Sequence, residues 1–191
     1  MYNKRMLKIV FATGNNRKLA EARAACKDFN IHVEQMTVEI NEIQHHDPVE
    51  IAKHKAAEAY RLVKSPVVIN DTSWSMPSLK GFPGGYMKDV KEWFEAQDFI
   101  NLANSKNDNR INFIETIIYI DGETTKIFNQ EYKGKIADKP RGTGNSLESI
   151  AEFDGVTLAE RHDRGEFSHK PEEYIWYQFA TWFSKKNITK G

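Results

Sequence analysis

The chain has 191 residues, of which 40% are hydrophobic and 28% charged, and its 27 basic and 27 acidic side chains cancel. This length fits one domain, or one domain with a small lobe, rather than two ordinary domains. Proteins that bind nucleic-acid polymers usually carry a clear basic excess, so a polymer partner is not expected. We therefore expect a single globular domain over residues 1–191.

Cys26 is the only cysteine, which excludes an internal disulfide and fits a reducing compartment. The apolar run at residues 9–12 is far too short for a signal peptide or a spanning helix, and no other stretch reaches membrane length. We expect a soluble, cytoplasmic protein without a membrane partner.

Hydrophobic periodicity predicts alternating strands and helices in the first half of the chain. In order, these are a strand at 7–13, a helix at 17–27, a strand at 31–38, a helix at 49–63 and a short apolar strand at 67–69. Asn15 or Asn16 caps the first helix, and Pro48 stands in the first turn of the second.

The second half of the chain is predicted to hold a hairpin between helices. In order, we expect a tight turn at 81–85, an amphipathic helix at 86–103, a loop at 104–109, hairpin strands at 113–120 and 124–132, a loop at 139–144 and an aromatic-rich helix at 172–184. The order strand–helix–strand–helix–strand, followed by a hairpin and a helix, indicates an α/β fold with a mixed sheet.

The turn Thr13-Gly14-Asn15, with Lys18 behind it, is the first candidate site. Glycine lets the backbone turn sharply, and the start of the following helix offers unpaired N–H groups to an anion. Thr13 and Asn15 add side-chain donors, and Lys18 can reach a phosphate. The pattern is neither a Walker loop nor a dinucleotide fingerprint, so an ordinary strand–helix turn with a solvated lysine remains the alternative.

Two acids form the second candidate site. Asp71 comes just past the apolar strand at 67–69, and this edge of an open α/β sheet is where ligands bind. Glu42 lies in the polar loop after the second strand. If the two converge, they offer the oxygen ligands that Mg²⁺ needs while it holds a polyphosphate. The alternatives are an Asx-turn for Asp71 and a solvated charge for Glu42.

Other ionisable residues have simpler interpretations. Lys55 lies in the middle of a predicted helix, where a solvated face is the ordinary role, and Glu21 reads as a surface ion-pair partner of Lys18. The neighbours His45 and His46 point in different directions and have no third ligand nearby, so they read as loop residues rather than a metal site.

Several motifs together resemble one known family. The matching stretches are 11–21, 42–44, 50–56, 67–72 and 79–88, followed by Pro140-Arg141-Gly142 and Ser168-His169-Lys170. The Thr-Gly-Asn-x-x-Lys turn combined with the later Gly-x-Pro-Gly-x-Tyr element is similar to the inosine triphosphatase (Ham1-like) family, which cleaves non-standard purine nucleoside triphosphates.

The resemblance implies a fold and a reaction. The fold would be an elongated mixed β-sheet flanked by helices, with two lobes around a cleft, related to that of the Maf proteins. The reaction would be Mg²⁺-dependent hydrolysis of a nucleoside triphosphate to the monophosphate and pyrophosphate, which cleans the nucleotide pool. The family commonly forms homodimers.

The resemblance also implies a role for each matching residue. Thr13, Gly14, Asn15 and Lys18 would hold the triphosphate. Glu42 and Asp71 would bind the magnesium ion, with Asp71 also the base for the attacking water. Lys55 would lie near the phosphates, and Lys88 would close over the substrate. The residues that would take part in recognising the base are Arg164, Ser168, His169 and Lys170.

The sequence departs from this family pattern in three places. Asn70 stands where the family usually has an acid, which removes one negative charge beside the metal. The aromatic segment that stacks on the base is replaced by residues 145–149, in which Glu148 can stand in for the family aspartate. Where the family has Ser-His-Arg, this chain has Ser168-His169-Lys170. Lysine offers a single ammonium group, whereas arginine offers a planar fork of hydrogen-bond donors.

Three interpretations follow from these departures. The chain is a pyrophosphatase for non-standard purine nucleotides, or the same enzyme with a preference shifted to a pyrimidine or modified base. The third alternative is a catalytically weak nucleotide-binding protein, favoured by Asn70 and opposed by the retained lysines and acids.

Overall fold

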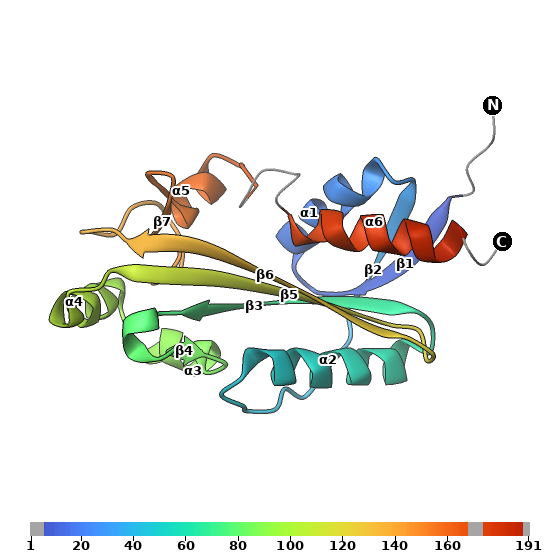
Figure 1. The fold of residues 1–191 in the computed structure, drawn as a ribbon, viewed down its shortest axis with the longest axis horizontal. Helices are drawn as coiled ribbons and strands as arrows, with labels where there is room; N and C mark the ends of the chain where they lie inside the picture. Colours follow the sequence, from blue (N-terminus) through green and yellow to red (C-terminus); the bar gives the residue numbers. More distant parts are fainter. Residues whose placement is uncertain (1–5, 168–173, 189–191) are drawn as a thin grey trace.

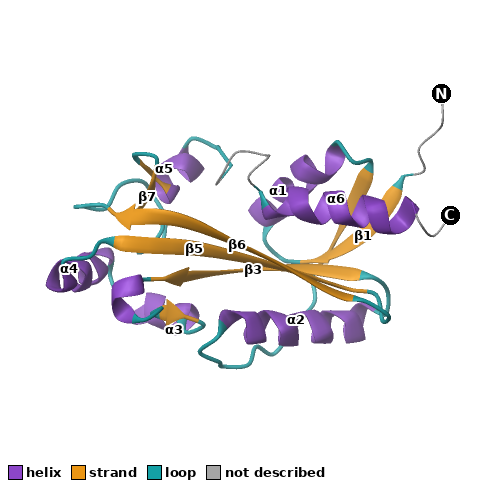
Figure 2. Ribbon diagram, in the orientation of Figure 1, coloured by secondary structure: helices purple, strands orange, loops and turns teal. Residues whose placement is uncertain are grey.

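A computed structural model describes residues 6–167 and 174–188 and has one mixed β-sheet with helices on both faces (Figures 1 and 2). The strands are β1 (Leu7–Ala12), β2 (Ile31–Met36), β3 (Val67–Ser75), β4 (Pro83–Gly84), β5 (Arg110–Ile120), β6 (Thr125–Ile136), β7 (Ala151–Phe153) and β8 (Val156–Thr157). The helices are α1 (Asn16–Lys27), α2 (Pro48–Val63), α3 (Met87–Trp93), α4 (Ala96–Lys106), α5 (Leu158–Asp163) and α6 (Ile175–Ile188), with a 3₁₀ turn, η1, at Pro77–Leu79.

The strand order is β2-β1-β3-β5-β6-β7-β8, with β4 paired to β3. β1 runs parallel to β2 and β3, and the other pairs are antiparallel. This arrangement confirms the predicted α/β fold with a mixed sheet. The long strands β3, β5 and β6 run between two lobes, one with β1, β2, α1, α2 and α6, the other with α3, α4, α5 and the short strands (Figure 1).

Three apolar clusters hold the layers together. One lies between the sheet and the helices α1 and α6, with Phe11, Trp176 and Phe179 fully buried. A second packs the small residues of α2 against the opposite face of β3 and β5. The third fills the far lobe around Trp74 and Phe99. Most of the closing aromatic helix is therefore core, as its composition allowed.

The helix starts follow the capping residues in the sequence. Asn15 caps α1, with its side chain accepting hydrogen bonds from the backbone N–H groups of Arg17 and Lys18. Asp47 caps α2, and Pro48 occupies its first turn. These caps satisfy backbone donors that have no partner inside the helix, so they set where each helix begins.

Some predicted boundaries are wrong. The single helix expected at 86–103 is two helices, because Phe94 is extended and Glu95 with Asp98 forms a capping box that starts α4. The strand expected at 67–69 continues to Ser75, because β5 pairs with it along its whole length. Asp71 therefore lies inside β3 rather than past its end. The sequence analysis also missed α5, β7 and β8.

One edge of β3 is interrupted. β1 pairs with it only at Val67 and Val68, and β4 pairs with the same edge at Trp74 and Ser75. In the part of the chain that the structure describes, no strand covers residues 69–73 on this side, whereas β5 pairs with the other side throughout. The gap leaves the backbone edge of β3 without a neighbouring strand at Asn70, Asp71 and Thr72.

The loop that carries Glu42 packs closely on the turn before α3. A Cβ at Gly85 would meet the His45 carbonyl oxygen at 2.1 Å and the Ile51 Cδ1 at 2.8 Å. Gly85→Ala must therefore move backbone, and we expect a loss of about 1–3 kcal/mol in the free energy of unfolding. Gly14→Ala is the matched control, because its Cβ would find its nearest neighbour, Thr37 Cγ2, at 3.8 Å. Equal melting temperatures for the two variants would contradict this packing.

Candidate active site

The phosphate turn joins β1 to α1 at the gap in the sheet. Asn15 Oδ1 accepts from the N–H groups of Arg17 at 2.9 Å and Lys18 at 3.2 Å, and Thr13 Oγ1 accepts from the Asn15 N–H at 3.1 Å. Asn15 is therefore both the helix cap and an exposed amide beside the cleft. The backbone bends at Gly14, as expected, although the φ of this residue is not positive. What Gly14 contributes is an open surface, because nothing lies close to where its Cβ would be.

Lys18 extends from the first turn of α1 to the open edge of β3. Its Nζ donates to the Asn70 carbonyl oxygen at 3.1 Å and to Thr72 Oγ1 at 3.4 Å. Burial lowers the pKa of Lys18, and the nearby carboxylates of Asp71 and Glu115 oppose this shift. The alternative of a solvated surface lysine is therefore wrong.

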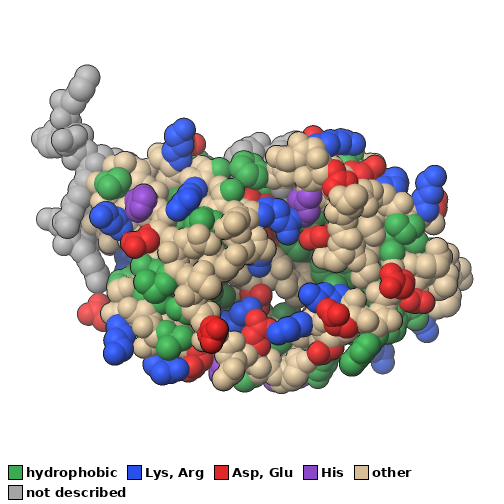
Figure 3. Space-filling model, turned by 180° about the vertical axis from the view of Figure 1, so that it is seen from behind, with side chains coloured by type: hydrophobic (Ala, Val, Ile, Leu, Met, Phe, Trp, Pro, Cys, Tyr) green, Lys and Arg blue, Asp and Glu red, His purple; other side chains and the backbone are tan. Residues whose placement is uncertain are grey.

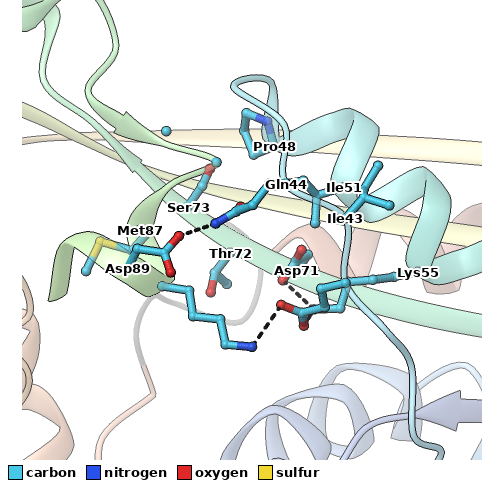
Figure 4. A pocket seen from close by; sticks show the side chains of 14 residues that line it. Ile43, Gln44, Pro48, Ile51, Lys55, Asp71, Thr72, Ser73, Met87 and Asp89 are labelled. Carbon is cyan, nitrogen blue, oxygen red and sulfur yellow. Dashed lines mark hydrogen bonds and ion pairs between the residues drawn. The ribbon is translucent and has the colours of Figure 1, made fainter. Parts of the chain in front are cut away.

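Asp71 and Lys55, labelled in Figure 4, belong with Glu42 and Lys88 to a continuous chain of charges on the other face of β3. Lys55 Nζ, from α2, lies 2.8 Å from Glu42 Oε1 and 3.3 Å from Asp71 Oδ1. Lys88, from α3, places its Nζ 3.6 Å from Glu42 Oε2. The two predicted acids do converge, and Lys88 connects them to the far lobe.

The electrostatics of this chain keep Lys55 and Glu42 charged. Burial alone would lower the pKa of Lys55, but the Asp71 and Glu42 carboxylates outweigh it and raise that pKa overall. Burial alone would raise the pKa of Glu42, but hydrogen bonding and charge from Lys55 and Lys88 lower it. Glu42 is therefore an ionised carboxylate at neutral pH, available to a cation.

Two cavities meet at these charges. One is lined by the phosphate turn with Lys18, and the other by Gln44, Ile51 and Lys88 (Figure 4); they share Glu42, Lys55 and Asp71. Gln44 Nε2 donates to Asp89 Oδ2, so the Glu42 loop is also tied to α3. The shared residues place the acids between a lysine of one lobe and a lysine of the other.

The donor set is consistent with a divalent cation held partly by substrate. Within residues 6–167 and 174–188, no group of three or more His, Cys, Asp or Glu side chains comes together as a metal site. Two carboxylates with phosphate oxygens and water are nevertheless an ordinary ligand set for Mg²⁺. The rings of His45 and His46 stack 4.5 Å apart, so the expectation that the two side chains point in different directions is wrong. Neither residue lines the two cavities.

Glu148 lies near the start of α1 in contact with two residues that the sequence analysis missed. Its Oε1 is 3.4 Å from Arg17 Nη2 and 4.0 Å from His162 Nδ1. The Arg17 guanidinium also contacts the His162 ring. Burial, and then the Arg17 charge, lower the pKa of His162. Spacing in the sequence gives no sign of this cluster, because Arg17 is 131 residues from Glu148 and 145 residues from His162 along the chain.

The remaining predicted site residues are not brought together. Arg164 is exposed at the end of α5 and makes no side-chain contact with the described part of the site. Ser168, His169 and Lys170 lie outside the described residues, so their predicted roles stay predictions. Glu21 is buried on the sheet side of α1 rather than on the surface, which corrects its expected role.

The outer surface is mixed in charge. Seen from behind, basic and acidic side chains alternate around a central hollow (Figure 3). The helices in the described ranges include none that is long and apolar enough to cross a membrane.

Lysines and acids gathered at an interrupted sheet edge, behind a strand–helix turn, define a class of site that binds a polyphosphate together with a cation. The Ham1 family model matches residues 9–170, and the chain belongs to this family. The resemblance found in the sequence motifs is thereby confirmed.

The relatives agree with this membership. The chain is 32% identical over 185 residues to a dITP/XTP pyrophosphatase of Methanosarcina acetivorans, covering 95% of this chain and 100% of the relative. It is 32% identical over 161 residues to inosine triphosphate pyrophosphatase 2 of Trypanosoma cruzi, covering 82% of each. The fold is similar to that of a HAM1 protein from Coxiella burnetii, with a TM-score of 0.78, 23% identity and coverage of 94% and 100%.

Gly14 offers a test of the phosphate turn. Because an added methyl group meets only Thr37 Cγ2, at 3.8 Å, Gly14→Ala should leave the melting temperature unchanged. The same methyl group would occupy the surface where a phosphate approaches the backbone, so we expect the KM for the triphosphate to rise about tenfold or more. Unchanged KM with unchanged stability would remove the turn from the binding site.

Proposed function

We propose that this chain hydrolyses non-standard purine nucleoside triphosphates, of the dITP and XTP type, to the monophosphate and pyrophosphate. The observation that carries the proposal is the convergence of Glu42, Lys55 and Asp71 between the two cavities. The activities in the names of its relatives supply the reaction and the substrate class.

The lysines and the helix start would bind the triphosphate. Lys18 lies behind the phosphate turn and Lys88 across the cleft, so the two can hold the phosphates from opposite sides. Charge neutralisation and alignment are the main requirements for cleaving a phosphoanhydride. Lys55 holds Asp71 and Glu42 together despite their like charge.

Asp71 would act as the base for the attacking water. It is partly buried at the open edge of β3, and its Oδ1 is held by Lys55 at 3.3 Å, so its orientation is fixed. A positioned carboxylate can accept the proton as the water attacks, and no covalent nucleophile is needed.

Glu42 and Asp71 fit a magnesium ion. Both are carboxylates on one side of the cleft, and Mg²⁺ is usually held by one or two carboxylates together with substrate phosphates and water. When bound, the ion neutralises charge on the phosphate oxygens and the departing pyrophosphate.

A broader base preference is the second candidate, and one observation favours it. Leu147, which stands in the segment where the family has its stacking aromatic, is fully buried in the core of the far lobe. It cannot form a shelf for a base. Glu148, with Arg17 and His162 beside it, is then the nearest described polar group for a purine edge, together with the predicted Ser168, His169 and Lys170.

The family resemblance also leads us to propose a homodimer that acts in the cytoplasm on free nucleotides rather than on a nucleic-acid polymer. The balanced charge supports the last point.

Asp71→Asn tests the catalytic assignment. We expect pyrophosphate release to fall by about 10²-fold or more, because the amide cannot accept the proton, while the fold is kept. Asp154→Asn makes the same change at an exposed aspartate outside the cavities and is the matched control, which should retain activity. A nucleotide that raises the melting temperature of wild type without turnover would instead indicate a binding protein. Retention of most activity by Asp71→Asn would contradict the assignment.

A nucleotide panel tests the substrate and the metal. Pyrophosphate release from dITP, ITP, XTP, dUTP and the standard triphosphates is measured with Mg²⁺ and with chelator. We expect activity only with the cation, and faster turnover of dITP and XTP than of dATP and dGTP. The loss of base stacking, worth about 1–3 kcal/mol, should reduce this difference in turnover between the non-standard and the standard nucleotides. Exclusive turnover of ITP and XTP would rule out the broader preference.

A further inference from the structure

Glu115 is a buried acid on β5 that the proposed mechanism does not use. It is 3% exposed, in a strand whose neighbouring positions are mostly isoleucine and phenylalanine. It is paired across the sheet with Thr72, on the face where Lys18 reaches β3. Tyr132 Oη donates to its Oε2 at 3.2 Å.

Charged and polar groups surround Glu115 from three elements. Lys18 and Glu21 face it from α1, Tyr132 from β6 and Asn70 from β3. Burial raises the pKa of Glu115 to about 7, and Glu21 adds to the rise, while Lys18 and Tyr132 oppose it. Asn70 is also buried, yet its two side-chain polar atoms make no hydrogen bond of normal geometry within the described residues.

A carboxyl group at this position is unfavourable for folding. Removing a carboxylate from water costs free energy that a single tyrosine hydrogen bond does not recover, and an apolar residue would continue the pattern of the strand. A buried acid with a strongly raised pKa next to a cleft is instead typical of a functional site. The cation that acts on it is Lys18, whose own charge burial disfavours.

We propose that Glu115 is a positioning residue that holds the Lys18 ammonium charged and directed at the cleft, from the strand next to the one that carries Asn70. Because Lys18 is assigned to the triphosphate, this inference rests on the proposed function. Asn70, where the family resemblance leads us to expect an acid, is neutral, and Glu115 supplies a carboxylate on the neighbouring strand.

The position of Glu115 on β5 places it on the face of β3 that carries the phosphate-binding lysine, and not on the face that carries Asp71. Side chains alternate along β3, so Asn70 and Thr72 lie on the α1 face and Asp71 on the α2 face, where Lys55 contacts it. Glu115 shares the α1 face through its pairing with Thr72. Its charge therefore acts on the phosphate-binding lysine from the α1 face, in addition to the charge of Asp71, which with Glu42 remains an acid for the cation.

Glu115→Gln tests the inference, because it removes the charge and keeps the shape. With dITP and Mg²⁺ at about pH 8, we expect KM to rise about tenfold and kcat to stay within about threefold, as for lost binding in both ground and transition states. The double variant Glu115→Gln with Asn70→Asp returns a carboxylate to the face of β3 on which Lys18 lies. Its KM should fall most of the way back to the wild-type value. Glu131→Gln makes the same change at an exposed glutamate of β6 and is the matched control, with KM within about threefold of wild type.

Stability gives a second readout that a merely structural residue would not produce. A pKa raised to about 7 means that the stabilising contribution of the protonated group is present at low pH and is lost as pH rises through 7. Glu115→Gln should therefore melt higher than wild type at about pH 8, with little difference at about pH 5, while binding the triphosphate more weakly.

The outcomes separate this inference from the proposed function. If wild type releases no pyrophosphate from any nucleotide, the proposed function fails. If wild type is active and Glu115→Gln has an unchanged KM, or the double variant recovers nothing, the role of Glu115 is overturned. A lower melting temperature for Glu115→Gln at both pH values would make it a structural residue and would also overturn it.

Discussion

The interrupted edge of β3 is the constraint on which the site depends. β1 ends where the phosphate turn begins, and β4 does not pair with β3 until Trp74. In a continuous sheet, Asn70 and Asp71 would face opposite layers and could not serve one ligand. At this free edge, Asn70 and Asp71 line one cavity together with Lys18, whose Nζ donates a hydrogen bond to the Asn70 carbonyl oxygen. The antiparallel pairing with β5 keeps the strand rigid at this point.

Two lysines at this edge, Lys55 and Lys18, are each balanced by nearby carboxylates. Lys55 lies between Glu42 and Asp71 and holds two like charges in one place, which a cation and the phosphates can then use. Burial lowers the pKa of Lys18, and the carboxylates of Asp71, Glu115 and Glu21 oppose that shift. Asp71 therefore acts on both lysines, and it links the two groups across β3.

Local patterns in the sequence were sufficient to predict most of the fold. Asn15, Pro48 and the apolar runs define helix starts and strands through interactions within a few residues. The break between α3 and α4 was missed because the capping box at Glu95 interrupts an otherwise continuous helical pattern. The length of β3 was missed because its polar half is held by pairing with β5, from Asn70 with Ile117 to Ser75 with Asn112, which are far apart in the sequence.

The site was predicted only in part for the same reason. Thr13, Lys18, Glu42, Lys55, Asp71 and Lys88 could be named because they lie in recognisable motifs. The contact of Glu148 with Arg17 and His162 depends on tertiary packing, and no spacing in the sequence indicates it. Glu115 reads as one polar residue in a hydrophobic strand, and only the sheet register places it beneath Lys18.

The most direct test of the account is to identify the products of dITP hydrolysis by ³¹P NMR in the presence of Mg²⁺. A triphosphate held by the phosphate turn and Lys88, with Asp71 directed at the α-phosphate, gives the monophosphate and inorganic pyrophosphate in equal amounts. Release of orthophosphate together with the nucleoside diphosphate would show that water attacks the γ-phosphate, and would contradict this arrangement of the site.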